Sequence, residues 1–259
     1  MENQRETLEN VCVLAANCKA AGSVNCNSTC WPYVVTHGAS GKGGLWNSTN
    51  IPKKYKDRRA ANMNLIASQN PQAYATAKMF VDNVVDYVED GVGLFLYSIP
   101  NQDNRMGTGT GKTTVATTLL NEYTIARIKL HATGKKKLTV QPSYFLRASE
   151  FQNTHKAKYS GSEEARLMAA EKFSRLKALM MEVELLVVDD ISLRNSTESL
   201  TDEFYEILDE RNIEGLATIL TSNQPIQKVG EMLSEQIASR IAGMCEMVGF
   251  VGKDNRKMF

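Results

Sequence analysis

A glycine-rich loop between an apolar segment and a long helical segment constrains this chain more than any other feature. Residues 93–99 (GLFLYSI) are short and apolar, as in a buried strand, and a helix is predicted from about Lys112 to Ala132. Between them lies GTGTGKTT, whose glycines let backbone N–H groups turn towards an anion. The helix that follows adds its positive end. A strand, such a loop and a helix in this order predict a phosphate-binding loop.

The residue types in this loop suit a nucleoside triphosphate. Lys112 is expected to contact the β and γ phosphates of ATP, or the β phosphate of ADP, and Thr113 to hold Mg²⁺. The full phosphate-binding-loop pattern has a glycine at the position of Met106, and here the glycine is instead the next residue, Gly107. The other residues predicted to surround the phosphates are Gly107, Thr108, Gly109, Thr110, Gly111 and Thr114.

Two carboxylates follow a second apolar run. Residues 185–190 read LLVVDD, so Asp189 and Asp190 stand at the end of a predicted strand, where open parallel sheets bind ligands. Asp189 is expected to hold magnesium, largely through water. Asp190 is expected to act as general base on the attacking water. Asn223, after the next predicted strand, is expected to orient that water, although a turn residue before Pro225 has the same sequence signature.

Strands and helices alternate from residue 93 onward, which predicts an α/β fold with a parallel sheet and helices on both faces. Residues 71–88 have helical spacing, 229–242 are predicted to form one helix, and the remaining strands are expected at 138–146, 185–188, 217–221 and 246–251. The 259 residues contain no apolar run long enough to span a membrane, and the polar N-terminus argues against secretion. A net charge of +1 excludes a broadly basic nucleic-acid coat.

Four of the five cysteines cluster near the N-terminus, at Cys12, Cys18, Cys26 and Cys30. Because no secretory signal precedes them, disulfides are a poor explanation, whereas four thiolates are able to hold one tetrahedral Zn²⁺. The alternatives are four unrelated thiols, or His37 in place of one thiolate. The Gly- and Ser-rich residues 31–50 are interpreted as a linker. The chain is therefore divided into a cysteine-rich zinc-binding module and linker (1–45) and an ATPase domain (46–259).

Several cations have two interpretations each. Arg240 is either a solvated side chain or an arginine finger for a neighbouring subunit's site, and Arg211 is a second candidate for that role. The basic residues of 53–59 and 135–137 are candidates for DNA contact or merely solvated. Arg256 is interpreted as an exposed arginine rather than a phosphate sensor.

Taken together, IPKKY, GTGKTT, LLVVDD, TSNQP and SRI resemble the DnaC/DnaI-type AAA+ helicase loaders, with the transposition ATPase IstB as a relative. The resemblance implies a P-loop αβα core with a five-stranded parallel sheet, no separate C-terminal lid and a zinc-binding N-terminal domain. It implies that Arg240 is the finger and that Ile51–Tyr55 lies near the adenine. It also implies that residues 149–181 carry extra helices for assembly and single-strand contact.

The function that this resemblance implies is that of a Mg²⁺-dependent ATPase acting in replication. Such a protein self-assembles with ATP, binds a hexameric replicative helicase and delivers it onto single-stranded DNA, in the bacterial cytoplasm and from a cellular or phage gene. An IstB-like transposition ATPase is the main alternative. A small P-loop kinase would need an acceptor pocket and a lid of its own. A zinc-bearing nucleic-acid-binding protein with a decayed ATP site is a further alternative. The intact ATP-site residues argue against it, namely Lys112, Thr113, Asp189 and Asp190.

Overall fold

The computed structural model describes residues 7–138, 140–192 and 196–258. At its centre is a five-stranded sheet in the order β2-β3-β4-β1-β5, in which every neighbouring pair is parallel. The predicted parallel sheet is thereby confirmed. Its strands are β1 (Gly93–Ser98), β2 (Ser143–Arg147), β3 (Leu185–Asp189), β4 (Ala217–Ser222) and β5 (Cys245–Phe250).

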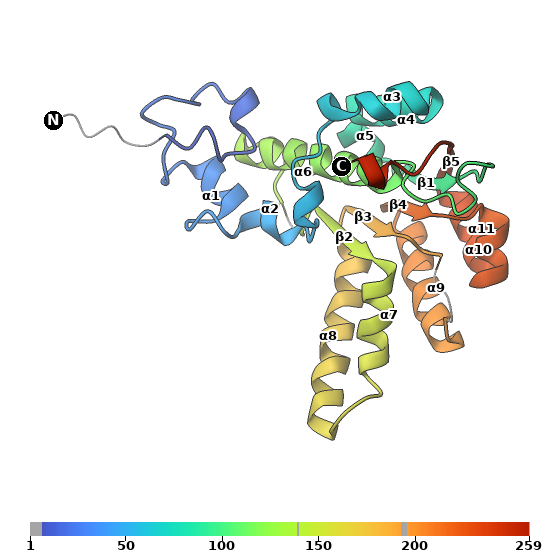
Figure 1. The fold of residues 1–259 in the computed structure, drawn as a ribbon. Coiled ribbons are helices and arrows are strands. Elements are labelled where there is room, and N and C mark those ends of the chain that lie inside the picture. The colour runs from blue at the N-terminus through green and yellow to red at the C-terminus, as the bar shows by residue number, and fades with distance from the viewer. Residues whose placement is uncertain (1–6, 139, 193–195, 259) are drawn as a thin grey trace.

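Two groups of helices cover the two faces of the sheet (Figure 1). Alternate side chains of each strand enter two separate cores: Leu185 and Val187 of β3 enter one, and Leu186 and Val188 enter the other. The helices packed on the first core are α3 (Asn64–Gln69), α4 (Pro71–Asp82), α5 (Val84–Glu89) and α6 (Lys112–Ala132). Those on the second are α7 (Ala148–Ala157), α8 (Glu163–Glu182), α9 (Glu198–Ile213), α10 (Ile226–Met232) and α11 (Glu235–Met244). The αβα core is therefore confirmed.

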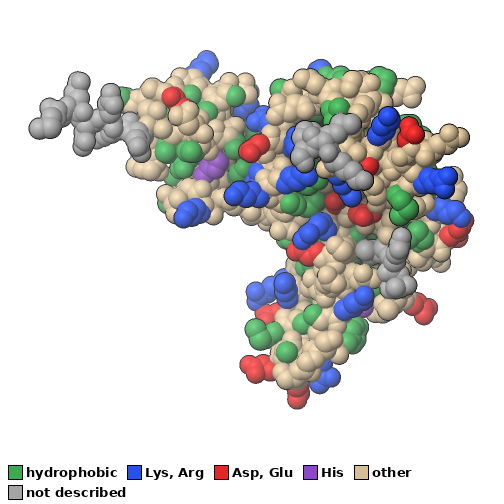
Figure 2. Space-filling view, in the orientation of Figure 1, with side chains coloured by type: hydrophobic (Ala, Val, Ile, Leu, Met, Phe, Trp, Pro, Cys, Tyr) green, Lys and Arg blue, Asp and Glu red, His purple; other side chains and the backbone are tan. Residues whose placement is uncertain are grey.

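Helices α7 and α8 form an arm that projects from the body of the protein (Figure 1). Phe173 and Met180 anchor its base in the second core, and Glu203 of α9 accepts hydrogen bonds from Lys158 and Lys177 of the arm. Most other side chains of α8 are exposed, and the arm carries both positive and negative charges (Figure 2). The arm therefore offers a surface that the rest of the chain does not cover.

Residues 31–50 are helical in part, which corrects the interpretation of this segment as a linker. Helix α1 (Trp31–His37) and helix α2 (Gly44–Ser48) pack against α6. Trp46 is only 6% exposed and shares a small core with Leu14, Ile125 and Ile128, so burial of apolar area outweighs the loop-like composition. The N-terminal residues also cover an edge of the sheet, because the carbonyl of Thr49 accepts the Phe145 N–H of β2 at 2.8 Å.

Three predicted boundaries were wrong. The helix predicted over 229–242 is two helices, since the backbone leaves helical geometry at Leu233 and Ser234 caps α11 by accepting the Ile237 N–H. The helical run from residue 71 is interrupted at Asn83, whose side chain donates to the Met79 carbonyl. Strand β2 begins only at Ser143, after Pro142, which has no N–H for a sheet.

Arg211 is buried within the structure, so it is not a candidate arginine finger. Its side chain is 0% exposed and donates to the carbonyls of Met180, Val183 and Ala217 and to the Thr218 hydroxyl. It thus joins the end of α8 to β4.

Among the described residues, no helix is long and apolar enough to cross a lipid bilayer.

Candidate nucleotide-binding site

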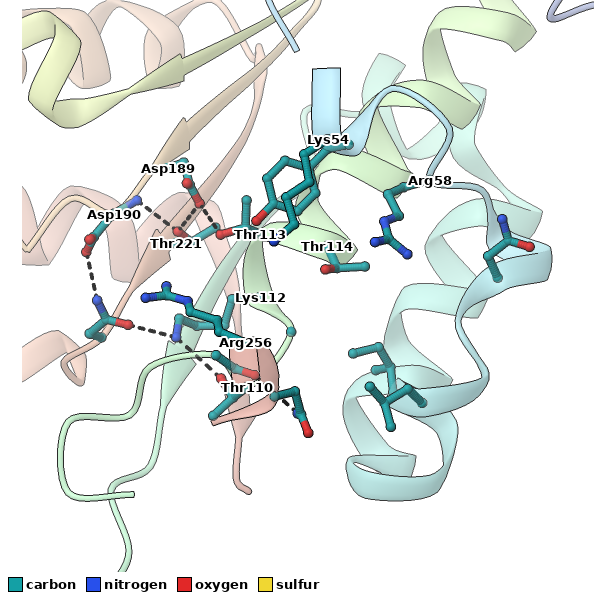
Figure 3. Close-up of a pocket in the computed structure, with 18 residues that line it drawn as sticks. Lys54, Arg58, Thr110, Lys112, Thr113, Thr114, Asp189, Asp190, Thr221 and Arg256 are labelled. Atoms are coloured by element: carbon teal, nitrogen blue, oxygen red, sulfur yellow. Dashed lines mark hydrogen bonds between the residues drawn. The ribbon is translucent and has the colours of Figure 1, made fainter. Parts of the chain in front are cut away.

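A cleft opens at the carboxyl ends of the central strands and brings together the predicted phosphate-binding residues except Gly107 and Thr108, which do not line it (Figure 3). Strand β1 leads into the loop 107–111, and α6 starts at Lys112 directly after it. Strands β3 and β4 lie next to each other and end at the same edge of the sheet. The residues along the cleft that the sequence had predicted are Gly109, Thr110, Gly111, Lys112, Thr113, Thr114, Asp189, Asp190 and Asn223.

The loop satisfies its glycine requirement at Gly107 rather than at Met106. Gly107, Gly109 and Gly111 have φ values of 61°, 68° and 106°, a region that other residues rarely adopt. Met106 lies outside this turn and is 59% exposed. The departure from the full pattern therefore leaves the phosphate-facing part of the loop intact.

Lys112 is 6% exposed and its ammonium is surrounded by oxygen acceptors. It donates to Ser98 Oγ of β1, to the Gly107 carbonyl at 3.0 Å and to Asn223 Oδ1 at 3.0 Å. Burial lowers the pKa of Lys112 to about 8, although Asp190 and Asp189 partly oppose the shift. A phosphate oxygen would give this cation the charged partner that its immediate neighbours do not supply.

Thr113 and Asp189 meet, as predicted for a magnesium site. The Thr113 hydroxyl donates to Asp189 Oδ1 at 2.8 Å, and Thr221 of β4 donates to the same oxygen at 2.7 Å. Hydroxyl and carboxylate oxygens are the ligands that Mg²⁺ takes from a protein when phosphates and water supply the others. Thr221 was not singled out from the sequence, because a threonine within a strand carries no signal of its own.

Asp190 adopts a left-handed backbone conformation with φ 58°, which is uncommon outside glycine and typical of functional sites. Thr221 Oγ1 accepts the Asp190 N–H at 2.9 Å and stabilises this conformation. Burial, and then the neighbouring Asp189, raise the pKa of Asp190. Asn223 donates to Asp190 Oδ1 at 3.1 Å and accepts from Lys112, so one amide joins the two charges.

One wall of the cleft comes from residues ahead of β1. Lys54, Tyr55 and Arg58 lie on it, and Asn62, Leu65 and Ile66 continue it (Figure 3). Of the segment Ile51–Tyr55, Lys54 and Tyr55 line the cleft, whereas Ile51 is 4% exposed and lies in the first core. From the sequence, the basic residues of 53–59 are candidates for DNA contact or solvated side chains. The structure places two of them, Lys54 and Arg58, along the cleft.

The segment after β5 contacts the phosphate-binding loop. Asn255 donates through its backbone and side chain to the Gly109 carbonyl, each at 3.2 Å, and Asp254 accepts the Thr108 hydroxyl at 2.8 Å. Arg256 is exposed, as predicted, but it also lines the cleft (Figure 3). Its charge partly opposes the rise in the pKa of Asp190 and adds to the lowering of the Lys112 pKa that burial causes. Nothing in the local sequence indicated this placement.

Arg240 lies outside the cleft, on α11 against α9. Its Nε is 2.7 Å from Asp209 Oδ1, and its guanidinium lies 5.9 Å from the centre of the Tyr205 ring. The side chain remains 41% exposed. It therefore cannot act on its own chain's site in this conformation.

The cysteines lie elsewhere. Cys12, Cys18, Cys26 and Cys30 line one small apolar cavity, and burial, with the other three thiols nearby, raises the pKa of Cys12. The described residues nevertheless include no group of three or more His, Cys, Asp or Glu arranged to hold a metal ion. His37 is 5% exposed rather than solvated, and its Nε2 accepts the Val13 N–H at 3.2 Å.

No protein-family model matches the sequence, and no curated protein matches it. Solved structures with a similar fold exist. The crystal structure of the DnaC helicase loader is 19% identical, with a TM-score of 0.55, and the match covers 77% of this chain and 99% of that one. A crystal structure of DnaI is 20% identical, with a TM-score of 0.56, and the match covers 80% and 95%. AMPPCP-bound DnaA from Aquifex aeolicus is 21% identical, with a TM-score of 0.52, but its match covers 78% of this chain and only 51% of that one.

The sheet order, the loop after β1 and the acidic residues at the end of β3 match the fold of an AAA+ P-loop core. Within that class, the chain has the fold of the DnaC and DnaI helicase loaders and of the AAA+ domain of DnaA. The resemblance to DnaC/DnaI-type proteins is thus confirmed at the level of the fold.

The buried ammonium of Lys112 makes stability depend on pH in the absence of nucleotide. Between the folded pKa of about 8 and the unfolded value of 10.5, the unfolded chain binds more protons, so stability rises with pH. We expect the wild type to gain on the order of 2 kcal/mol relative to Lys112→Met between pH 7 and pH 10. Urea denaturation of both proteins across this range measures the difference. Parallel pH profiles for the two proteins would show that Lys112 is not held as a buried cation.

Proposed function

We propose that this protein is an ATP-dependent loader that binds a hexameric replicative helicase and delivers it onto single-stranded DNA. The observation that carries the proposal is the extent of the fold match, which covers 99% of the solved DnaC chain and 95% of the solved DnaI chain but only 51% of the solved DnaA chain. The arrangement of Lys112, Thr113 and Asp189 supports nucleotide binding. A transposition ATPase of the IstB type is the alternative function.

The residues of the cleft have separable roles in ATP hydrolysis. Thr113 and Asp189 would hold Mg²⁺, which neutralises charge on the phosphates when it is bound. Lys112 and the N–H groups of the loop bind the phosphate oxygens. Asp190, whose pKa is raised by burial, is the proposed general base towards an attacking water, and Asn223 orients that water beside it.

Asp190→Asn should bind ATP within about threefold of the wild-type affinity but release phosphate roughly 100-fold more slowly, because the general base is lost while the phosphate contacts remain. Single-turnover phosphate release with saturating ATP and Mg²⁺ measures the step. Asp103→Asn, at an exposed acid outside the cleft, is the matched control. Wild-type turnover in Asp190→Asn would remove Asp190 from the base role.

Arg240 acts, in this proposal, as an arginine finger in the site of the next subunit of an ATP-dependent oligomer. Its position outside its own cleft and its partial exposure are compatible with that role. Entry into a neighbouring site requires exchange of the ion pair with Asp209 for a contact with phosphate.

Arg240→Ala should therefore bind ATP normally and lose about 10-fold or more of the turnover that appears when subunits assemble. A mixture of Arg240→Ala and Lys112→Ala should recover activity, because the Lys112→Ala subunit supplies a finger to an intact site. Lys228→Ala, at an exposed cation of α10, is the control. A mixture that is no more active than the sum of its parts would contradict a finger acting between subunits.

The cysteine-rich module is proposed to bind one Zn²⁺ and to contact the helicase. The four thiols line one cavity, and thiolates are the ligands of structural zinc. The arm of α7 and α8 is proposed to contribute to assembly and to contact with single-stranded DNA, as its projection and charges allow.

Light scattering of a mixture with the host's replicative helicase, ATP and Mg²⁺ tests the loader proposal. We expect a discrete complex with several copies of this protein per helicase hexamer. Cys26→Ser should lose zinc, measured by metal analysis, and lose the complex while keeping ATP affinity. Absence of any complex, with DNA-dependent ATPase activity retained, would favour a transposition ATPase instead. A metal-free wild type prepared without chelator would refute the zinc site.

A further inference from the structure

Two cations on the wall of the cleft have no assigned role. Lys54 and Arg58 belong to the turn formed by residues 53–62 and line the cleft near Thr114 (Figure 3). Within the described ranges neither side chain forms an ion pair. Lys54 contacts only the ring of Tyr55, with its Nζ 5.9 Å from the ring centre. Two unpaired cations at the edge of a cleft repel each other unless an anion binds between or beside them.

Their neighbours in the same turn have structural partners. The ammonium of Lys56 donates to the Trp46 carbonyl at 2.8 Å and to Asn47 Oδ1 at 3.2 Å. Arg59 forms a double hydrogen bond with Glu122, at 2.8 and 3.0 Å. The turn is therefore anchored by two of its cations and directs two others towards the cleft.

The charge lining the cleft suits a polyanion. The cationic side chains are Lys54, Arg58, Lys112 and Arg256, whereas only Asp189 and Asp190 are acidic. Lys112 and Arg256 are the cations that act on Asp190. Lys54 and Arg58 stand on the opposite wall, so the positive charge flanks the space on both sides, as an extended phosphate chain requires.

Helix α6 determines where this wall stands. Asn121 is fully buried, and its Nδ2 donates to the carbonyls of Tyr55, Lys56 and Arg58 at 3.2, 3.2 and 2.8 Å. Glu122 accepts the Ala60 N–H at 2.9 Å in addition to both bonds from Arg59. These contacts lower the pKa of Glu122 in spite of its partial burial. One helix thus begins with the phosphate-binding Lys112 and, further along, holds the opposite wall.

We propose that Lys54 and Arg58 bind the phosphate chain of the nucleotide in cis, and that Asn121 and Glu122 are positioning residues for this pair. The proposal rests on nucleotide binding at the cleft, as proposed above. Because Arg58 lies beside Thr114 and away from Asp190, it binds the part of the chain that ATP and ADP share. It therefore contributes to both affinities, whereas Arg256, near Asp190, acts mainly on ATP.

Equilibrium titration with fluorescent ATP and ADP tests the pair. Arg58→Gln should weaken both nucleotides about 10-fold, as loss of a charge-assisted hydrogen bond implies, and Lys54→Gln should weaken both less, because its side chain is more exposed. Lys53→Gln, an exposed cation of the same turn that does not line the cleft, is the matched control. Equal affinities of wild type, Arg58→Gln and Lys53→Gln would overturn the proposal. Failure of the wild type itself to bind nucleotide would instead refute the proposed function.

A double-mutant cycle tests the positioning role. Asn121→Ala should weaken ATP binding about as much as Arg58→Gln, and the double variant should be no weaker than either single variant, because both changes remove the same contact. Tyr123 lies on the same helix as Asn121, and Tyr123→Phe, which loses a partly buried hydrogen bond to Glu184, should keep wild-type affinity. The positioning role would be contradicted if the effects of Asn121→Ala and Arg58→Gln on ATP affinity were additive. It would also be contradicted if Tyr123→Phe lost as much affinity, because Asn121 would then act only through overall stability. If Asn121→Ala does not fold, the comparison of Arg58→Gln with Lys53→Gln still decides the assignment of the cations.

Discussion

The geometry of the cleft depends on one buried charge. The ammonium of Lys112 has lost most of its water, so its charge is tolerated only where several oxygens converge on it. The oxygens come from Ser98 at the end of β1, from the loop at Gly107 and from Asn223 after β4. The end of β1 and the loop, which are close to Lys112 in the chain, therefore meet the distant Asn223 at one atom. Since the same Asn223 also binds Asp190, the phosphate-binding cation and the proposed base share one network.

Helix α6 connects this network to the rest of the molecule. It starts at Lys112, anchors the wall of the cleft through Asn121 and Glu122, and packs against the cysteine-rich module through Ile125 and Ile128. A helix keeps its residues at a fixed rise, so the spacing between these contacts varies little. Residues of the N-terminal module and of the candidate nucleotide cleft are thus attached to the same helix.

Composition was a poor guide wherever burial outweighed local preference. Residues 31–50 are rich in Gly, Ser, Thr and Asn, yet two short helices form there because Trp46 and its neighbours bury apolar area against α6. Arg211 was a second candidate for an arginine finger, but it lies fully buried among carbonyl groups. In both cases the deciding partners are distant in sequence. The apolar runs of β1, β3 and β4, by contrast, formed the predicted strands to within one residue at each end, because their own residues already define a buried segment.

The sequence by itself determined the phosphate-binding loop and the acids that follow β3. These features are local: glycine conformation, the start of a helix and the end of an apolar strand are properties of neighbouring residues. Only the tertiary structure decided what each basic residue does. Lys54 and Arg58 face the cleft, Arg59 and Arg240 pair with carboxylates, and Arg256 approaches Asp190 from beyond β5. The physical reason is that the role of a charge depends on which opposite charges and how much water surround it, and folding brings those surroundings from distant parts of the chain.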